Sequence, residues 1–291
     1  MRHPHAEDQD YFTSWNNKQA PGFHASDNQW GYGPIYRSQL LDARLKPQIA
    51  GGRKTNLAGV INAMEGAGTV DLRADRLLPF AFKVLGNGRN PRLADAIAKL
   101  KAWHAAGSHR LDRDQDGVYE HSDAIRIMDA WWPRWLHAEF EPTLGRDLFS
   151  KIEDIVSLDN PPNNDGDHLG SAYQDGWWGY VSKDLRQVTG RRVRGPHSRI
   201  YCGAGHSGRQ SRRRLLRGCR AALESSLGQA LRVNESDLYH DDLCKAQKKD
   251  GNQWCYDAVS FSSLGAVTQP LIHWINRPTF QQANEIQGHR P

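Results

Sequence analysis

Apolar residues recur every three or four positions along most of the chain, which is the spacing of helices with one buried face. The first such stretch covers residues 35–49 and is ended by Gly51 and Gly52. Asn56 is placed to cap a second helix over residues 57–65. Further helices are predicted over residues 71–85, from Pro91 through His104, and over 122–140, 147–158, 172–188 and 219–231. The pattern therefore predicts a predominantly helical fold.

The helix expected over residues 122–140 is the longest and the richest in aromatic side chains. Its apolar side carries Trp132 and Trp135, for which packing is the expected role. Pro133 lies between them and is expected to kink the helix. Residues 259–280 alternate more between apolar and polar positions, so this section is expected to contain strands.

Composition and charge limit the class of protein. Ten tryptophans among 291 residues argue against disorder, and no apolar run approaches the roughly 18 to 20 residues that a membrane span requires. The net charge of +5 is uneven, because residues 183–220 hold 12 Lys and Arg against one acid. Such a stretch could bind phosphate backbones. A non-catalytic protein that binds nucleic acid or another anionic surface is therefore the alternative function.

The four cysteines lie late in the chain, at Cys202, Cys219, Cys244 and Cys255. Their spacing matches no zinc-binding pattern. We expect two local disulfides, Cys202 to Cys219 and Cys244 to Cys255, with buried free thiols as the alternative. Disulfides would place the protein outside the cytoplasm, although its first residues are too polar to begin a secretory signal.

Two adjacent carboxamides, Asn16 and Asn17, follow a bulky aromatic residue and precede Ala20-Pro21-Gly22, which cannot continue regular structure. One amide group could therefore be held rigidly. Hydrolysis of an amide builds negative charge on the carbonyl oxygen, and a fixed N–H donor at that point lowers the barrier by roughly 3 to 4 kcal/mol. Taken alone, such a pair is more often an Asx turn.

A wider pattern surrounds this pair. Residues 11–22 read Tyr-Phe-Thr-Ser-Trp-Asn-Asn-Lys-Gln-Ala-Pro-Gly. Four later segments accompany them: Met-Asp-Ala-Trp-Trp at 128–132, Leu-Asp-Asn-Pro-Pro-Asn-Asn at 158–164, Ser-Ala-Tyr-Gln-Asp-Gly-Trp at 171–177 and Trp-Ile-Asn-Arg-Pro-Thr-Phe-Gln-Gln at 274–282. As a set, these segments resemble the β subunit of the penicillin acylase (penicillin amidase) family, especially its actinobacterial branch. The resemblance extends over nearly the whole chain.

This resemblance implies a fold and an activity. The family belongs to the N-terminal-nucleophile hydrolases, whose members have a sandwich of two β-sheets between helical layers. The implied fold class is α+β (αββα), of which residues 1–291 would be one partial domain, the mostly helical C-terminal portion. The implied enzyme is a hydrolase of non-peptide C–N bonds. It would remove an acyl side chain from an amide such as a β-lactam antibiotic, an acylated lactone or a lipopeptide, without a cofactor for the chemistry.

The resemblance also implies roles for two residues. In the family, a precursor cleaves itself into α and β chains, and the serine exposed at the start of the β chain attacks the amide, with its own α-amino group as base. The asparagine after the signature tryptophan is an oxyanion donor, and Asn16 is the matching residue. An arginine about twenty residues later lies near the active site of relatives, and Arg37 is the matching position.

Two features depart from the family pattern. Nothing before Trp15 resembles the nucleophile segment, so we expect this chain alone to be inactive. Its expected partners are a missing N-terminal β-chain segment that bears the serine and an α chain of the same precursor. Residues 204–218, which contain Arg212-Arg213-Arg214, are an atypical Arg-rich insertion. A shifted reading frame is expected there in preference to a binding patch.

Residues 112–123 match the spacing of a calcium loop. Asp112, Asp114 and Asp116 occupy positions 1, 3 and 5, glycine occupies position 6, Glu120 occupies position 9, and Asp123 occupies position 12. A solvated Asp-rich turn is the alternative, because Asp at position 12 is a weaker ligand than a bidentate Glu. Any Ca²⁺ bound here would be structural and separate from the calcium site of the family.

Overall fold

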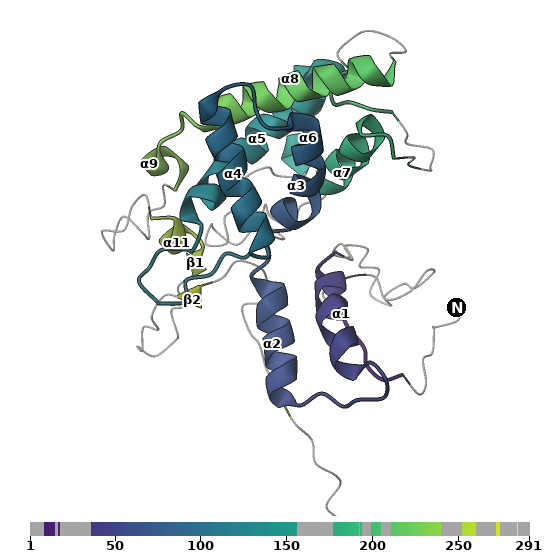
Figure 1. Ribbon diagram of the computed structural model, residues 1–291, viewed down its shortest axis with the longest axis vertical. Helices are drawn as coiled ribbons and strands as arrows, with labels where there is room; N and C mark the ends of the chain where they lie inside the picture. Colours follow the sequence, from purple (N-terminus) through teal and green to yellow (C-terminus); the bar gives the residue numbers. More distant parts are fainter. Residues whose placement is uncertain are drawn as a thin grey trace, which may run out of the picture. The chain divides into compact units, whose positions relative to one another are not determined.

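Helices account for nearly all of the regular structure in the part of the chain that the computed structural model describes (Figure 1). The described residues are 9–14, 17, 36–155, 177–191, 193, 199–204, 211–239, 252–259, 272–273 and 284. The chain divides into two compact units, one of Met1–Thr69 with Pro278–Pro291 and one of Val70–Arg277. The predicted helical character is confirmed, and the prediction of one partial domain over residues 1–291 stays a prediction.

The first unit contains two helices that pack together, α1 (Tyr36–Ile49) and α2 (Leu57–Gly68). Asn56 caps α2 as predicted, because its side-chain oxygen accepts a hydrogen bond from the backbone N–H of Gly59 at 2.9 Å. The side chain of Gln48 on α1 donates to the backbone carbonyl of the same Gly59 at 3.1 Å. This hydrogen bond links α1 to the first turn of α2.

The second unit is built around a long helix, α5 (Ser122–Leu144), which packs against its neighbours through three fully buried tryptophans, Trp131, Trp132 and Trp135. Trp131 and Trp135 stack with ring centroids 4.4 Å apart, so the aromatic stripe is packing, as predicted. The other helices are α3 (Leu72–Leu85), α4 (Pro91–Ala105), α6 (Arg146–Ile155), α7 (Trp177–Val188), α8 (Arg212–Ala230), α9 (Glu235–Leu238) and α11 (Gln253–Tyr256).

Helix α5 packs mainly against α8, α4 and α6, while α3 packs against α7, α4 and α8. The described strands of this unit are β1 (Ala258–Val259) and β2 (Ile272–His273), which pair antiparallel. They lie where the alternating pattern predicted strands, and most of the remaining predicted stretch is outside the described residues. No described helix combines the length and the apolar character needed to cross a membrane.

Two helices extend beyond their predicted bounds by four residues or more, and α2 ends three residues later than predicted, at Gly68. Helix α5 continues through Pro133 and Pro142 to Leu144 instead of ending at residue 140. Helix α8 begins at Arg212 instead of 219, because Ser211 caps it and Leu215 continues its buried face toward the N-terminus. The outer ends of the helices predicted over 147–158 and 172–188 lie outside the described residues.

A disulfide joins Cys202, in the segment after α7, to Cys219 on α8, as predicted. Gly203 has a φ of 75°, and a Cβ there would lie 2.2 Å from the backbone nitrogen of Cys219. Glycine therefore permits the close approach that the bond requires. Cys255 is also disulfide-bonded, and its predicted partner Cys244 lies outside the described residues.

Candidate functional site

The segment that carries Asn16 is attached to helix α1. The hydroxyl of Thr13, three residues before Asn16, donates to Asp42 Oδ1 on α1 at 2.7 Å. Asn17, immediately after Asn16, is buried with 9% of its surface exposed. Asn16 itself lies outside the described residues, so its role as an oxyanion donor stays a prediction.

Arg37 lies in the first turn of the same helix α1. Its side chain is outside the described part of the structure, and its place near an active site stays a prediction. Because Asp42 on α1 binds Thr13, however, the helix that carries Arg37 contacts the segment that leads to Asn16. The two predicted site residues thus belong to one unit and to segments joined by a hydrogen bond.

The predicted calcium loop brings three carboxylates together. One ligand oxygen from each of Asp112, Asp114 and Asp116 lies within 4.8 Å of the others. The two oxygens of Asp112 accept hydrogen bonds from the backbone N–H groups of Asp116, at 3.1 Å, and Gly117, at 2.9 Å. Gly117 has a φ of 85°, the conformation for which glycine is suited at the sharp turn of such a loop.

Asp123, the fourth predicted ligand, lies in the first turn of α5 and pairs with Lys99 on α4, with a distance of 2.8 Å between Oδ2 and Nζ. The hydrogen bond from Lys99 is the main cause that lowers the pKa of Asp123. Asp123 does not belong to the cluster of the three loop aspartates. The structure therefore brings together three of the four predicted ligands.

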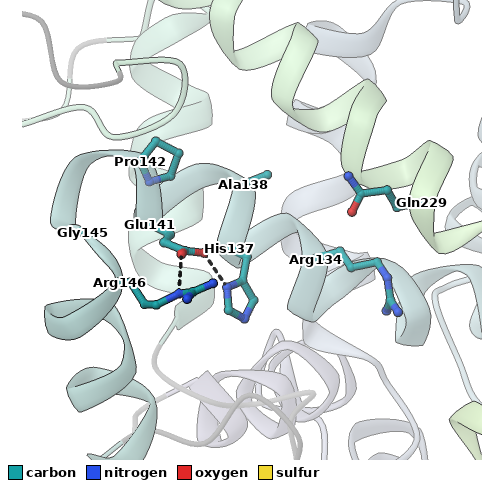
Figure 2. A pocket seen from close by; sticks show the side chains of 8 residues that line it. All are labelled: Arg134, His137, Ala138, Glu141, Pro142, Gly145, Arg146 and Gln229. Carbon is teal, nitrogen blue, oxygen red and sulfur yellow. Dashed lines mark hydrogen bonds and ion pairs between the residues drawn. The ribbon is translucent and has the colours of Figure 1, made fainter.

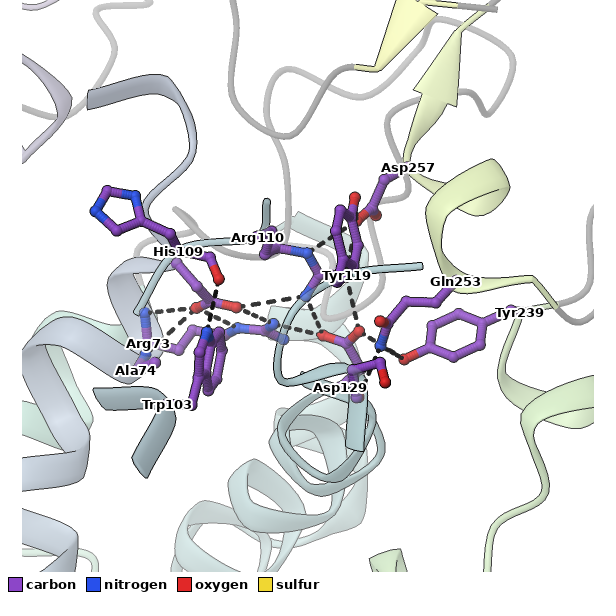
Figure 3. A network of polar contacts seen from close by, with 12 residues as sticks. Arg73, Ala74, Trp103, His109, Arg110, Tyr119, Asp129, Tyr239, Gln253 and Asp257 are labelled. Atoms are coloured by element: carbon purple, nitrogen blue, oxygen red, sulfur yellow. Dashed lines mark hydrogen bonds and ion pairs between the residues drawn. The ribbon is translucent and has the colours of Figure 1, made fainter. Parts of the chain in front are cut away.

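A network of buried charges links distant parts of the second unit (Figure 3). Arg110 donates to both carboxylate oxygens of Asp129 at 2.9 Å and to Asp257 at 2.8 Å. Arg73 contacts Asp71 and Asp129, each at 2.6 Å. The side chains of Arg110, Asp71 and Asp257 have no exposed surface. The network therefore ties α3, α5 and the segment before β1 to the loop that contains Arg110.

Two phenols complete this network. Tyr119 donates to Asp257 Oδ2 at 2.6 Å, and Tyr239 donates to Asp129 Oδ2 at 2.9 Å. Gln253 in turn donates to the hydroxyl of Tyr239 at 2.6 Å. Burial and the negative charge of Asp257 raise the pKa of Tyr119, and burial and Asp129 raise the pKa of Tyr239. Both phenols therefore stay protonated and remain hydrogen-bond donors.

The charged members of the network keep their charges. Burial opposes ionisation of Asp129, but Arg110 and Arg73 outweigh it and lower the pKa of this carboxyl group. Burial likewise opposes the charge on Arg73, and Asp71 and Asp129 outweigh it and raise the pKa. Each buried charge thus has opposite charges and hydrogen bonds around it, which is the condition for tolerating burial. These contacts indicate a structural role.

The motif at residues 128–132 contained the sequence signal for this network. Asp129 is an acid placed among the apolar residues of a buried helix, where an unpaired charge would be strongly unfavourable. The identities of its partners could not be inferred, because Arg73 lies 56 positions away and Tyr239 lies 110 positions away.

Two further buried carboxyl groups lie on neighbouring helices, Glu139 on α5 and Asp184 on α7. Glu139 is 1% exposed and Asp184 is fully buried. Trp135 donates its indole N–H to Glu139 Oε2 at 2.7 Å, whereas Glu139 Oε1 has no hydrogen-bond partner among the described residues. Asp184 pairs with Lys183 at 2.7 Å and accepts the backbone N–H of Cys202 at 2.9 Å. Burial, and then the negative charge of Asp184, raises the pKa of Glu139 well above its usual range.

The contribution of Glu139 to the free energy of unfolding should therefore fall as the pH rises above about 4.5, because the unfolded chain releases the proton of Glu139 before the native protein does. The contribution is lost progressively up to the raised native pKa, by at most about 1.4 kcal/mol per pH unit. Glu139→Gln keeps an acceptor for Trp135 and removes the titration. Urea unfolding between pH 4 and pH 8 should show a shallower decline for this variant; equal slopes would contradict the assignment.

The second unit also contains an open pocket of about 690 Å³. Figure 2 shows Glu141 directed toward His137 and Arg146, with distances of 3.0 and 3.8 Å between the paired atoms. The ring of His137 also contacts Glu153 on α6 at 3.2 Å. The remaining lining residues are Arg134, Ala138, Pro142, Gly145 and Gln229. None of the predicted site residues lines this pocket, and its polar side chains mainly link α5 to α6.

Comparison with known proteins identifies one family. The sequence profile of the family described as penicillin amidase matches residues 1–278, which is nearly the whole chain. No curated protein sequence matches the chain. The matched range contains the Trp-Asn-Asn segment, the residues of the buried network and the calcium-type loop.

Proposed function

The chain belongs to the penicillin amidase family, and we propose that it supplies the oxyanion-binding part of an acylase that cleaves the acyl side chain from an amide. The family consists of amide hydrolases that are processed from a precursor into separate chains. The family match over residues 1–278 is the observation that carries this proposal. Asn16 is the proposed oxyanion donor, and Arg37 is a second residue of the same site.

The described contacts around Asn16 support its assignment as the oxyanion donor. An oxyanion donor must be held in place before the charge develops, since a mobile amide would have to be ordered during the reaction. Thr13 is hydrogen-bonded to Asp42 on α1, and Asn17 is buried. Thr13 and Asn17, which lie before and after Asn16 in the sequence, are therefore restrained, which suits a preorganised amide donor.

The proposed reaction needs a nucleophile from another segment. A serine hydroxyl attacks the amide carbonyl carbon while an amine base takes the hydroxyl proton, and the carbonyl oxygen becomes negatively charged. The side-chain N–H of Asn16 stabilises that oxygen. Collapse of the intermediate breaks the C–N bond, the amine leaves with a proton, and water then hydrolyses the acyl-serine. We assign the serine to a β-chain segment that precedes the Trp-Asn-Asn signature, with an α chain as the second partner.

The proposed substrate is an acylated amide of the β-lactam, acyl-lactone or lipopeptide class. We also propose that the enzyme works outside the cytoplasm. The disulfide between Cys202 and Cys219 supports this location, because such bonds persist in oxidising compartments.

An assay of amide hydrolysis tests the proposal. We expect the purified 291-residue chain to leave a chromogenic acyl-anilide intact, and the same chain co-expressed with a serine-bearing β segment and an α chain of the family to hydrolyse it. A matched co-expression in which that serine is replaced by alanine should be inactive. Enzyme-like hydrolysis by the chain alone would overturn the assignment of the nucleophile to another segment. Inactivity of the complete assembly toward acyl-amides of all three classes would contradict the proposed activity.

We further propose that the loop at Asp112, Asp114 and Asp116 binds a structural Ca²⁺. Three convergent carboxylates and a glycine at the turn fit a hard cation with oxygen ligands. Because a ligand that binds only the native state stabilises it, Ca²⁺ at 100 times its Kd should add about 2.7 kcal/mol to the free energy of unfolding. Asp114→Asn should abolish the rise in melting temperature, whereas Asp147→Asn, on α6, should preserve it. A melting temperature unaffected by millimolar Ca²⁺ would refute the site.

A further inference from the structure

Exposed cations of the second unit lie on α3, just after α7 and in the first turns of α8. Lys83 Nζ on α3 lies 5.6 Å from the centroid of the Phe80 ring, and the guanidinium carbon of Arg191, just after α7, lies 5.4 Å from the same centroid. A guanidinium nitrogen of Arg212, at the start of α8, lies 2.9 Å from the position that a Cβ on Gly190 would take. Three further exposed arginines, Arg213, Arg214 and Arg217, follow Arg212 in the first turns of α8. We call this group of exposed cations the basic patch; it consists of Lys83, Arg191, Arg212, Arg213, Arg214 and Arg217.

The basic patch carries no compensating negative charge in the described structure. All six side chains are exposed, and none forms an ion pair with a described carboxylate. Helix α8 has no acidic residue in its first turn. Cations at that end of a helix are also disfavoured by the helix dipole. The arrangement is therefore unfavourable for the isolated chain, and an anion bound to the patch would relieve it.

The arginines are held on a regular helix. Leu215, Cys219, Leu223 and Leu227 are buried at every fourth position of α8, and Cys219 is fixed by its disulfide. Leu215 continues this buried stripe into the Arg-rich turns, which favours a folded surface over a shifted reading frame. The spacing of four residues places Arg213 and Arg217 side by side on the exposed face, with about 5 to 6 Å between their Cβ atoms.

We propose that the basic patch binds nucleic acid through its phosphate backbone. A guanidinium group makes paired hydrogen bonds to phosphate oxygens, which suits the five arginines of the patch. Closely spaced phosphates match several cations on one surface. An anionic bilayer fits less well, because membrane-surface helices place apolar side chains beside their cations. In the first two turns of α8, the side chains exposed to solvent are arginines, and cations cover the Phe80 ring.

Contacts to phosphates alone predict binding that is strong at low salt and independent of base sequence. Six neutralised phosphates give a slope of about −5 for log K against log salt, so binding to duplex DNA should weaken roughly 1,000-fold between 50 and 200 mM salt. Replacing Arg212, Arg213, Arg214 and Arg217 together by glutamine should leave a slope of about −2.

The experiment measures binding of the full 291-residue chain to two 20-bp duplexes of different sequence by fluorescence anisotropy. The matched control replaces four exposed cations outside the patch, Lys54, Lys101, Lys151 and Arg232, by glutamine, which changes the net charge equally. Thermal melting of both variants checks that they fold. The control should keep most of the slope of about −5, and the slope of the patch variant should fall to about −2.

Three outcomes would overturn the proposal. The first is that the chain fails to bind either duplex at 50 mM salt. The second is that the two variants weaken binding equally, which would indicate that binding depends on the net charge of the chain and not on a defined site. The third is that poly-glutamate or vesicles containing phosphatidylglycerol bind more tightly than DNA at equal charge concentration, which would assign the basic patch to an acidic protein or a membrane. Amide hydrolysis is not a readout here, so the result is independent of the proposed acylase activity.

Discussion

Replacement of Arg110 by alanine should lower the free energy of unfolding of the second unit by about 3 to 5 kcal/mol, the range for removing one partner of a buried ion pair. Arg110 has no exposed side-chain surface and binds the carboxylates of Asp129 and Asp257. Its loss removes the guanidinium group that pairs with Asp257, a buried carboxylate that also binds Tyr119. Chemical denaturation followed by tryptophan fluorescence measures the effect, since three tryptophans lie on the adjacent helix α5.

The control for this prediction is Arg113→Ala, three positions further along the chain. Arg113 is 65% exposed and pairs with Glu120 at 3.5 Å, so its removal should change stability by at most about 1 kcal/mol. Arg110→Lys should recover only part of the loss, because one ammonium group cannot make the paired contacts to Asp129 and also reach Asp257. If Arg110→Ala were no more destabilising than Arg113→Ala, the network would not hold the unit together.

Replacement of Asn16 by alanine should reduce kcat of the complete, processed enzyme about 100- to 1,000-fold, which is the effect of losing one oxyanion donor. KM should change little, because the lost interaction strengthens as charge develops in the transition state. Single-turnover measurements of acyl-enzyme formation with a chromogenic amide would assign the loss to the acylation step.

The neighbouring carboxamide provides the matched comparison. Asn17→Ala should leave kcat within about tenfold, and because Asn17 is 9% exposed its loss should appear mainly as reduced stability. The Asx-turn interpretation of Asn16 makes the opposite prediction, with a lower melting temperature and an unchanged kcat. A larger fall in kcat for Asn17→Ala than for Asn16→Ala would transfer the proposed role to the second asparagine.

The sequence was most informative where the signal is local. Helix periodicity placed α1 to α4 within a few residues, because each buries one face and has a recognisable boundary such as Asn56 or Pro91. The disulfide between Cys202 and Cys219 followed from short spacing. The start of α8 was not predicted, because four of its first six residues are arginines and Leu215 alone did not reveal that the buried apolar face begins there.

The charge network could not be predicted, because its contacts depend on tertiary structure. Arg110 and Asp257 are 147 positions apart, and neither carries a local motif. The calcium-type loop shows what residue spacing can predict and what it cannot. Spacing alone grouped Asp112, Asp114 and Asp116 correctly, but it could not reveal that Lys99 lies beside Asp123. The role of Asn16 rests on family resemblance, since two adjacent asparagines are too common to specify an oxyanion site.

The separation of Arg110 and Tyr119 from Asp257 has a consequence for how the second unit reaches its native state. These residues are 147 and 138 positions from their shared carboxylate, so the contact forms only after most of the unit has been synthesised. Until then, Arg110 cannot be buried with its full set of partners. A ribosome-bound chain released before Asp257 should retain an exposed, protease-sensitive region around the loop that holds Arg110. Long-range contacts of this kind also slow folding, and the emergence of Asp257 should mark the point at which protease resistance appears.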